Sequence, residues 1–396
     1  MSAPAFDLDH LRRYPDVEGA DLVAVDATDR LVLDEAAPAL AAAGAGEVVV
    51  IGDRYGALTL GAIALHGARD VRVHQDALVN ERALVANAER ASLTGSFRSL
   101  DLDPELVTGA RVVLLQLPRG LAALEEIAEL IAAHAAPDVV VVAGGRLKHM
   151  SRSMNGVLAE HFADVTASLA RQKSRCLLAR QPTPPEVFPS FPRRHLEEEH
   201  GVWIAAHGAA FAGPSLDLGT RYLLTFLGEM SPLARDAIDL GCGTGVLAAQ
   251  LAATRPELHV VATDTSRAAV RSTRATLEAN ALGERVRVVR ADGLENQPPV
   301  SADLIVCNPP FHVGASVQPD VAIDLFKDAA RVLRPGGELW TVFNSRLGHA
   351  GALRRIVGST KVMGDNGKFT VTRSIKQQPA RTVEEESGTA PSPAIE

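Results

Sequence analysis

Four groups of residues in the second half of this chain could do chemistry. Asp239 precedes the glycine-rich turn Gly241-Cys-Gly-Thr-Gly245, Asp264 and Asp292 follow later, and the last group is Asn308-Pro-Pro-Phe-His312. Glycines let a backbone approach a ligand closely, and carboxylates accept hydrogen bonds from hydroxyl, amino and ammonium groups. The first three groups therefore suit a ligand that contains a nucleoside, and the fourth suits a planar amino group.

The glycine-rich turn predicts a nucleoside cofactor without phosphates. Its Asp-x-Gly-x-Gly-x-Gly pattern lacks both the Gly-x-Gly-x-x-Gly spacing that seats a pyrophosphate and the Gly-Lys-Ser/Thr of a phosphate-binding loop. Asp239 would repel a pyrophosphate but could bind the ammonium of a methionine moiety, while Asp264 could bind both ribose hydroxyls. Asp292 would reach the adenine amino group. S-adenosylmethionine fits this pattern best; an ordinary tight turn and a helix-capping Asp292 are the alternatives.

The sequence Asn308-Pro-Pro-Phe is the most specific of the four groups and predicts methylation of an exocyclic amine. Proline fixes its own φ and restricts the residue before it, so the Asn308 amide and the Pro309 carbonyl become two fixed acceptors. Such a pair matches the two N–H bonds of an amino group and would direct its lone pair toward a methyl sulfonium. Pro310 belongs to the same turn, and Phe311 offers a stacking face for a base. A proline-stiffened turn after a buried strand is the alternative.

The elements that must hold these residues alternate between strands and helices. The apolar pattern predicts strands at 236–240, 259–264, 286–290 and 302–307, and helices at 246–253 and 268–280. Strands that alternate with helices of this length indicate βαβ units. The second half is therefore expected to form a doubly wound, mostly parallel sheet.

The first half repeats this order of elements in weaker form. The turn, the ribose acid and the Asn have counterparts at offsets of 189, 188 and 192 residues, namely Gly52, Asp76 and Gln116. Nearly constant offsets indicate an internal duplication. In the first copy an Arg and a Tyr stand within the turn, and Gln-Leu-Pro-Arg replaces Asn-Pro-Pro-Phe. We therefore expect an amino-terminal domain without catalytic activity.

The predicted fold is α/β, with two tandem Rossmann-like domains of which the first is degenerate. Prolines crowd the stretch from 181 to 192, and the end of the chain is rich in Glu, Pro, Ser and Thr without an apolar period. The expected divisions are a methyltransferase-like domain at 1–180, a proline-rich linker at 181–200, the catalytic domain at 201–376 and a disordered acidic tail at 377–396.

Residues 201–376 resemble class I S-adenosylmethionine-dependent methyltransferases of the small-methyltransferase type. The Asn308-Pro-Pro-Phe-His form, the segment Leu216-Asp-Leu-Gly-Thr-Arg-Tyr-Leu-Leu224 and the degenerate first half together resemble the guanine-N2 ribosomal RNA methyltransferases. This resemblance implies an amino-terminal copy that has lost cofactor binding and aids folding or RNA recognition. It also implies that Asn308 to Phe311 hold the guanine, and that the cofactor is bound by Gly219, Thr220, Asp239, Gly241, Gly243 and Asp264.

The overall charge excludes a protein that coats nucleic acid through its global field. The chain of 396 residues has a formal net charge of −8. Two stretches are nevertheless basic, with a net charge of +6 over 141–195 and +7 over 331–376. Contact with RNA phosphates explains this local charge, and so do solvated helix faces.

The remaining composition points to a cytoplasmic monomer. Three cysteines, Cys176, Cys242 and Cys307, are too few for a disulfide framework or a four-cysteine zinc site, and we expect no metal. The amino terminus lacks the apolar stretch of a signal peptide, and no run approaches the ~20 apolar residues of a membrane span. Two domains in one chain remove the need for a dimer.

The sequence therefore predicts an enzyme that methylates N2 of a guanine in ribosomal RNA, either 16S or 23S. One alternative is an amino methyltransferase that acts on a protein glutamine or on adenine N6, although those enzymes usually have Tyr at the position of Phe311. The other is a non-enzymatic RNA-binding protein that retains a cofactor fold.

Overall fold

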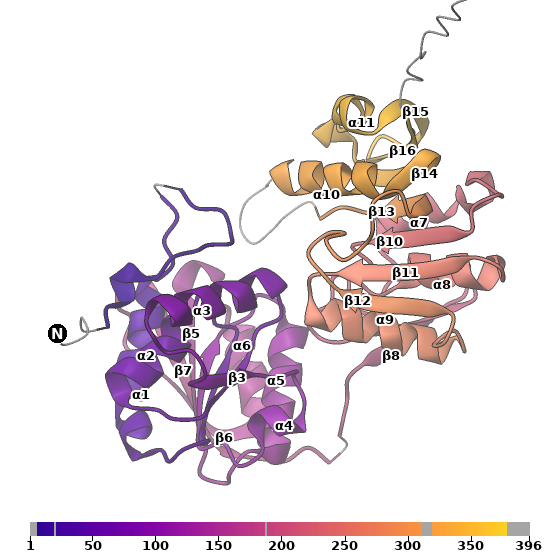
Figure 1. The fold of residues 1–396 in the computed structure, drawn as a ribbon. Coiled ribbons are helices and arrows are strands. Elements are labelled where there is room, and N and C mark those ends of the chain that lie inside the picture. Colours follow the sequence, from indigo (N-terminus) through magenta and orange to yellow (C-terminus); the bar gives the residue numbers. More distant parts are fainter. Residues whose placement is uncertain (1–5, 20, 187, 311–318, 378–396) are drawn as a thin grey trace, which may run out of the picture.

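Two seven-stranded sheets with the same strand order form the two halves of the protein (Figure 1). The computed structural model describes residues 6–19, 21–186, 188–310 and 319–377. The first sheet has the order β3-β2-β1-β4-β5-β7-β6, and the second has the order β12-β11-β10-β13-β14-β16-β15. The prediction of two tandem α/β domains of Rossmann-like topology is thereby confirmed.

The first sheet is covered by helices on both faces. Strands β1 to β5 pair in parallel, while β7 runs antiparallel to both β5 and β6. Its strands are β1 (Val48–Ile51), β2 (Val71–His74), β3 (Phe97–Ser99), β4 (Val112–Gln116), β5 (Val140–Arg146), β6 (Phe162–Ala167) and β7 (Ser174–Pro182). Its helices are α1 (Ala27–Ala42), α2 (Ala57–His66), α3 (Leu78–Arg90), α4 (Pro104–Val107), α5 (Leu121–His134) and α6 (Arg152–His161).

The second sheet repeats this arrangement, and the four strands expected from the sequence lie at the expected residues. Its strands are β10 (Asp236–Leu240), β11 (His259–Asp264), β12 (Val286–Arg290), β13 (Ala302–Cys307), β14 (Leu333–Asn344), β15 (Gly358–Asp365) and β16 (Phe369–Lys376). Its helices are α7 (Leu218–Leu224), α8 (Val246–Thr254), α9 (Arg267–Ala279), α10 (Pro319–Val332) and α11 (Ala350–Ile356).

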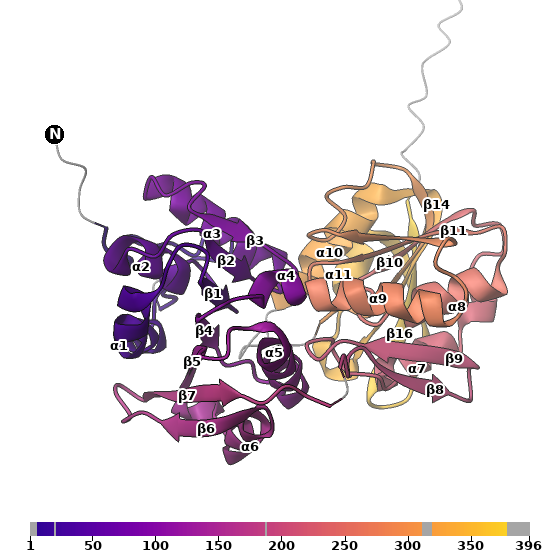
Figure 2. The same cartoon turned by 90° about the horizontal axis from the view of Figure 1, so that it is seen from below.

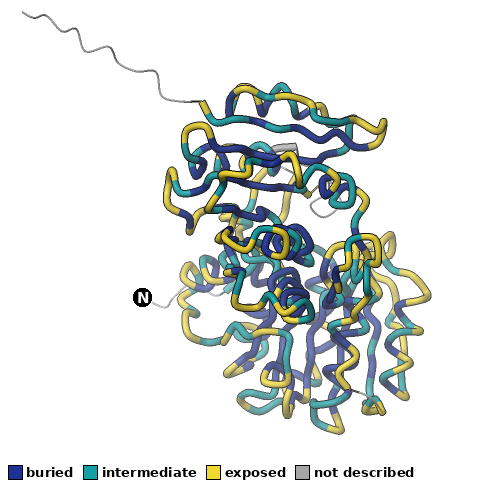
Figure 3. Tube along the Cα trace, turned by 90° about the vertical axis from the view of Figure 1, so that its right-hand side faces the viewer, coloured by how far each residue is buried: buried dark blue, intermediate teal, exposed yellow. Residues whose placement is uncertain are grey.

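Each sheet has an apolar core on both faces because its central strands alternate their side chains. In β1, Val48 and Val50 belong to one cluster of buried residues, and Val49 and Ile51 belong to another. β1 is buried along its whole length and β4 along all but its last residue, as expected for parallel strands between two helix layers (Figure 3). Among the described residues, no helix is long and apolar enough to cross a bilayer.

A two-stranded antiparallel ribbon connects the halves. The interval 181–200 contains the end of β7 and strand β8 (Arg193–Glu197), which pairs with β9 (Val202–Ala206). β9 is fixed to α9 because the Ala205 and His207 N–H groups donate to side-chain hydroxyls of that helix. The expected tail lies outside the described residues except for Gln377. Short 3₁₀ helices lie at Leu8–His10, Leu147–His149, Leu227–Glu229 and Ser345–Leu347.

Candidate active site

Three strands of the second sheet bring candidate residues to one edge. In the paired register, Leu240 at the end of β10 stands beside Thr263 of β11 and Cys307 of β13. The carboxyl edge of an open parallel sheet is where ligands bind in such folds. The residues that follow these three strand positions, and so lie side by side, are Gly241, Asp264 and Asn308.

The turn after β10 has left-handed backbone at its glycines. Gly241, Gly243 and Gly245 have φ angles of 76°, 55° and 77°. A Cβ on Gly245 would lie 2.6 Å from Cγ2 of Thr273, so α9 leaves room only for glycine. The Gly243 N–H donates to Oδ2 of Asp264 at 3.0 Å, which ties the turn to the next strand. Two of the predicted cofactor-binding groups are therefore in direct contact.

Asp239 is buried just below this turn. Its side chain is 1% exposed, and Oδ2 accepts a hydrogen bond of 3.0 Å from the Ala248 N–H in the first turn of α8. Burial raises the pKa of Asp239 from 3.8 to about 7. A cation that pairs with this buried carboxylate would stabilise its ionised form, which suits the binding of an ammonium group.

The amide of Asn308 is held in one orientation. Its Nδ2 donates to Oδ2 of Asp217 at 2.8 Å and to Oγ1 of Thr220 at 3.0 Å. Both partners come from the start of α7, where Asp217 is the N-cap residue. Because the two donors of the amide are used, Oδ1 is left as an acceptor. That is the group needed to receive an N–H of a substrate amine.

Gly219 allows this arrangement to be compact. A Cβ at Gly219 would lie 3.0 Å from Oδ2 of Asp217 and 3.4 Å from both polar atoms of the Asn308 amide. Gly219 and Thr220 were expected at the site from their sequence segment, whereas Asp217 was not identified as a site residue. The signal for it is the spacing of an N-cap Asp three residues before Thr220.

The other predicted site residues differ in exposure, and one of them lies outside the described residues. Pro309 is buried and Pro310 is exposed, while Phe311 lies outside the described residues. Asp292 is exposed, and its carboxylate lies 4.0 Å from the guanidinium of Arg82 in the first domain. Asp264 is partly buried, and burial raises its pKa.

Two buried oxygen atoms show whether the site offers acceptors that S-adenosylmethionine and an amine could bind. Oδ1 of Asp239 and Oδ1 of Asn308 are buried and have no hydrogen-bond partner within the part of the chain that the structure describes. Buried polar atoms are normally paired, so an orphaned acceptor points to a missing donor. The ammonium of the cofactor suits the first atom, and an amine suits the second. The residues present therefore fit the cofactor.

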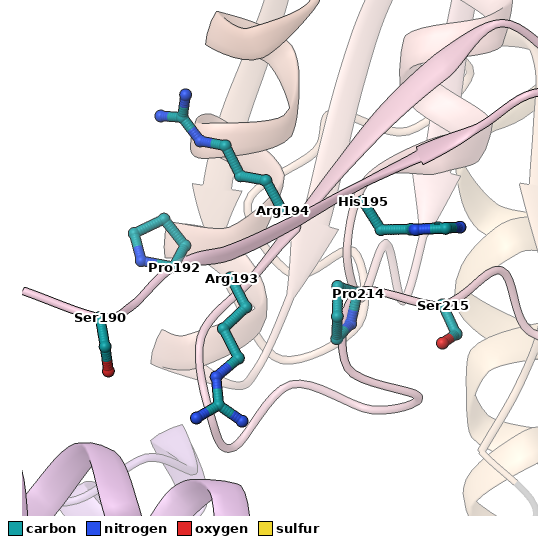
Figure 4. Close-up of a pocket in the computed structure, with 7 residues that line it drawn as sticks. All are labelled: Ser190, Pro192, Arg193, Arg194, His195, Pro214 and Ser215. Atoms are coloured by element: carbon teal, nitrogen blue, oxygen red, sulfur yellow. The ribbon is translucent and has the colours of Figure 1, made fainter.

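A basic cleft lies near this edge. It has a volume of about 660 Å³ and is lined by Arg193, Arg194 and His195 of β8 together with Pro214 and Ser215. Figure 4 shows Arg193 and Arg194 on opposite sides of the strand. Arg193 pairs with Glu125 of α5, while Arg194 and His195 are exposed. Ser215 on the cleft lining lies two residues before Asp217, which bonds the Asn308 amide.

Ion pairs neutralise part of the basic stretches predicted from the sequence. In the first stretch, acidic partners lie within 4 Å of Arg146, Arg171, Arg180 and Arg193. In the second stretch, partners lie within the same distance of Arg331, Arg334 and Arg373. The exposed Arg346 and Lys368 flank the end of β14, where the Ser345 N–H donates to the Lys368 carbonyl.

An acidic cluster near β8 has its own counter-charge. Donor atoms of Glu197, Glu199 and His200 lie within 4.8 Å of one another. Arg221 pairs with both carboxylates, at 2.9 Å from Glu197. We assign no metal to this cluster.

Comparisons with known proteins match the two halves of the chain separately and together. A family model described as the methyltransferase small domain matches residues 201–373, and one described as the RLMG N-terminal domain matches residues 3–184. A Streptomyces avermitilis protein named ribosomal RNA large subunit methyltransferase G is 35% identical over 93% of this chain and 97% of its own length. A Pseudomonas aeruginosa protein of the same name is 35% identical over 95% and 99%.

A solved structure has the same two-domain fold. It is the T. thermophilus 16S rRNA N2 G1207 methyltransferase in complex with AdoMet and guanosine. It aligns with a TM-score of 0.69 over 87% of this chain and 92% of its own, at 24% sequence identity. The likeness covers both sheets.

Proposed function

Because the chain belongs to the ribosomal RNA large subunit methyltransferase G family, we propose that it methylates the exocyclic N2 of a guanine in the RNA of the large ribosomal subunit. It is an S-adenosylmethionine-dependent methyltransferase. The observation that carries the choice of an amino group is the Asn308 amide, which is fixed by two hydrogen bonds with its buried Oδ1 left as an acceptor. The structural relative that acts on guanine N2 favours the same atom.

The residues of this chain would act by orientation. S-adenosylmethionine supplies an electrophilic methyl group on a sulfonium. Asn308 Oδ1 and the Pro309 carbonyl would accept the two N–H bonds of the guanine amine and direct its lone pair toward that methyl group. A strong base is unnecessary, since the nitrogen becomes acidic as it is methylated. Asp217 and Thr220 would keep the amide from turning its NH₂ group toward the amine.

The cofactor would lie along the strand ends that hold the three acids. Asp239 would bind its ammonium, Asp264 its ribose hydroxyls and Asp292 its adenine, above the turn of Gly241, Gly243 and Gly245. We assign catalysis to residues 201–376 and a non-catalytic role to residues 1–180. We expect the enzyme to act in the cytoplasm, where ribosomal subunits are assembled, and to act as a monomer.

Two exposed basic groups would contact the RNA backbone. One is formed by Arg194 and His195 in the cleft that leads to Ser215. The other is formed by Arg346 and Lys368 at the end of β14. RNA whose target base has left its helix still carries phosphates on both sides of that base, so two separate groups of exposed cations suit it.

The proposal is tested with purified protein, radiolabelled S-adenosylmethionine, and separate small- and large-subunit RNAs and particles from a strain that lacks the gene. N2-methylguanosine in the large-subunit fraction is expected, and Asn308→Ala should abolish it while the variant still binds the cofactor. Label in the small-subunit fraction would overturn the choice of subunit. Label in a protein fraction, or in N6-methyladenosine, would instead support an amino methyltransferase of the alternative kind.

A further inference from the structure

A short segment of the amino-terminal domain, Asp76–Arg82, is bonded to the cofactor loops of the carboxy-terminal domain. Ala77 forms an antiparallel bridge with Ser266. The Leu78 N–H donates to the Thr265 carbonyl at 3.1 Å, and the Arg267 N–H donates to the Asp76 carbonyl at 3.0 Å. The two segments are counterparts in the duplication, so equivalent loops of the two copies pair with each other.

The Asp76 carboxylate caps the helix that follows the ribose-binding acid. Its Oδ1 accepts from the Ala268 N–H at 2.8 Å and from Oγ of Ser266 at 3.0 Å. The Ser266 N–H in turn donates to Oδ1 of Asp264 at 2.9 Å. A carboxylate suits the free N–H groups at the start of α9. Asp76 is thus connected to Asp264 through a single residue.

Buried ion pairs extend this contact. Oε2 of Glu81 lies 2.9 Å from the Arg267 guanidinium and 2.6 Å from that of Arg290. Both arginine side chains are less than one-fifth exposed, and Arg290 also donates to the Asp76 carbonyl at 3.0 Å. Removing one member of such a set would leave a charge poorly compensated.

The same segment reaches the loop expected to hold the adenine. Arg82 lies 2.5 Å from Glu295 and 4.0 Å from Asp292. Oε1 of Glu295 also accepts from the Asp292 N–H at 3.0 Å. Figure 1 shows α3, which begins in this segment, on the side of the first domain that faces β12. Both loops that carry an adenosine-binding acid are therefore held from the first domain.

We propose that Asp76, Glu81 and Arg82 are positioning residues for the adenosine half of the cofactor site, so the amino-terminal domain is needed for cofactor affinity. Asp76 stands 188 residues before Asp264 and is its counterpart. In the second copy, Asp264 would face the ribose. In the first copy, the equivalent Asp76 holds the loop that carries Asp264 in place. This inference rests on the proposed cofactor site, although not on the identity of the methylated base.

The test compares cofactor affinity with folding in the full-length protein. Isothermal titration calorimetry measures the Kd of S-adenosylmethionine, and thermal unfolding measures Tm for each variant. Asp76→Ala should weaken binding roughly 5- to 10-fold, which is the scale of a lost helix cap. Asp76→Asn should recover most of the affinity because its amide oxygen can accept the same bonds. Arg82→Gln, at a more exposed position, should weaken binding about 2- to 3-fold.

Glu126→Gln is the matched control. Glu126 of α5 bonds His207 and Gly208 across the same domain boundary, at 2.6 and 2.7 Å, and neither partner belongs to a cofactor loop. The variant should lower Tm and leave the Kd of the cofactor unchanged. At saturating cofactor, the kcat of Asp76→Ala should stay within about twofold of the unmodified enzyme, since the methyl transfer residues are untouched.

Each outcome decides the matter. Unchanged Kd in both Asp76→Ala and Arg82→Gln would overturn the inference, even if Tm falls, and would leave the proposed function intact. Equal weakening in Glu126→Gln would also overturn it, because any loosening of the domains would then suffice. A parent protein that binds the cofactor but methylates no RNA would refute the proposed substrate alone, and the binding comparison would still decide the role of Asp76.

Discussion

At the scale of single residues, the proposed site contains an amide that two hydrogen bonds hold in one orientation. Asn308 could present either an acceptor or a donor to an amine, and only the acceptor would help the proposed reaction. Thr220→Val removes one of the two acceptors that fix the Nδ2 group while keeping the side-chain volume. We expect kcat to fall about 10-fold, the scale of one buried hydrogen bond. Single-turnover kinetics measure this, and Thr220→Ser is the control that should retain the rate. Equal rates for the Val and Ser variants would contradict the role of the hydroxyl.

If Asp239 binds the cofactor ammonium as proposed, its buried carboxyl will make cofactor binding depend on pH. Its pKa is raised from 3.8 to about 7, so without cofactor the protein loses stability as pH rises between these values and the carboxyl ionises. Binding of the ammonium needs the ionised form, and affinity therefore increases with pH. We expect the Kd of S-adenosylmethionine to fall roughly 5- to 10-fold between pH 6 and 7.5. Calorimetry at several pH values measures the profile. Asp239→Asn should bind weakly with a flat profile, and a flat profile in the unmodified protein would refute the assignment.

At the scale of elements, one glycine fixes how the second domain docks on the first. A Cβ at Gly208 would lie 2.2 Å from the Ala122 carbonyl oxygen at the start of α5. Backbone atoms on both sides cannot yield easily, so Gly208→Ala should lower the stability of the protein by about 1–3 kcal/mol. Denaturant unfolding followed by circular dichroism measures the change. Gly228→Ala, where a Cβ meets nothing within 4 Å and the backbone is not left-handed, controls for the loss of glycine flexibility. If Gly208→Ala is as stable as the control variant, Gly208 does not determine how the domains dock.

The sequence predicted the parallel elements well and the antiparallel edges poorly, for a physical reason. Parallel strands such as 236–240 and 302–307 are short apolar runs before a turn, which periodicity detects. β16 instead buries Thr370, Thr372 and Ser374. The hydroxyls of Thr372 and Ser374 pair with hydroxyls on neighbouring strands, and that of Thr370 donates to Ser345 just after β14. Polar residues satisfied in this way do not give an apolar pattern. For the same reason β8 was taken for linker, since its residues are mostly exposed.

Prediction of the site had a similar limit. The glycine turn, Asp264 and Asn308 each belong to a local sequence motif. The order of the strands predicts that they lie close together. The bond from Asn308 to Asp217 spans 91 positions, and no local pattern reports it. Likewise, the sequence identifies Asp76 as the counterpart of Asp264. Its hydrogen-bond partners at the start of α9, Ser266 and Ala268, lie 190 and 192 residues away along the chain. Contacts between domains arise from docking and cannot be read from the periodicity of either domain.

At the scale of the whole molecule, the two copies of the fold should bind one cofactor. In the first copy, Asp53 is buried and accepts hydrogen bonds from Gly56 and Thr59 of its own turn. Tyr55 is also buried there and donates to Asp16 at 2.5 Å. The groups that would have to meet a cofactor are thus already used inside the domain. Calorimetry should give a stoichiometry of one per chain, which Asp264→Ala should reduce to no detectable binding. Two sites per chain, or binding that survives this substitution, would contradict a degenerate first domain.

RNA affinity should come from the few cations that the fold leaves exposed beside the site, because the protein as a whole is acidic. Arg346 and Lys368 lie at the end of β14, next to the strand that carries Asn308, and neither forms an ion pair with an acidic side chain of the described residues. Removal of one phosphate contact lowers the slope of log Kd against log salt concentration by somewhat less than one. We expect Arg346→Gln with Lys368→Gln to weaken RNA binding by about 10-fold at moderate salt and to reduce the salt slope by about 1.5, with the Kd of the cofactor unchanged. Filter binding to large-subunit RNA across a salt series measures both quantities. The control is Arg171→Gln, whose arginine is paired with Asp34 on the first domain and should leave the slope as it is. If the double variant and the Arg171→Gln control have the same salt slope, Arg346 and Lys368 are solvated surface residues that do not bind RNA.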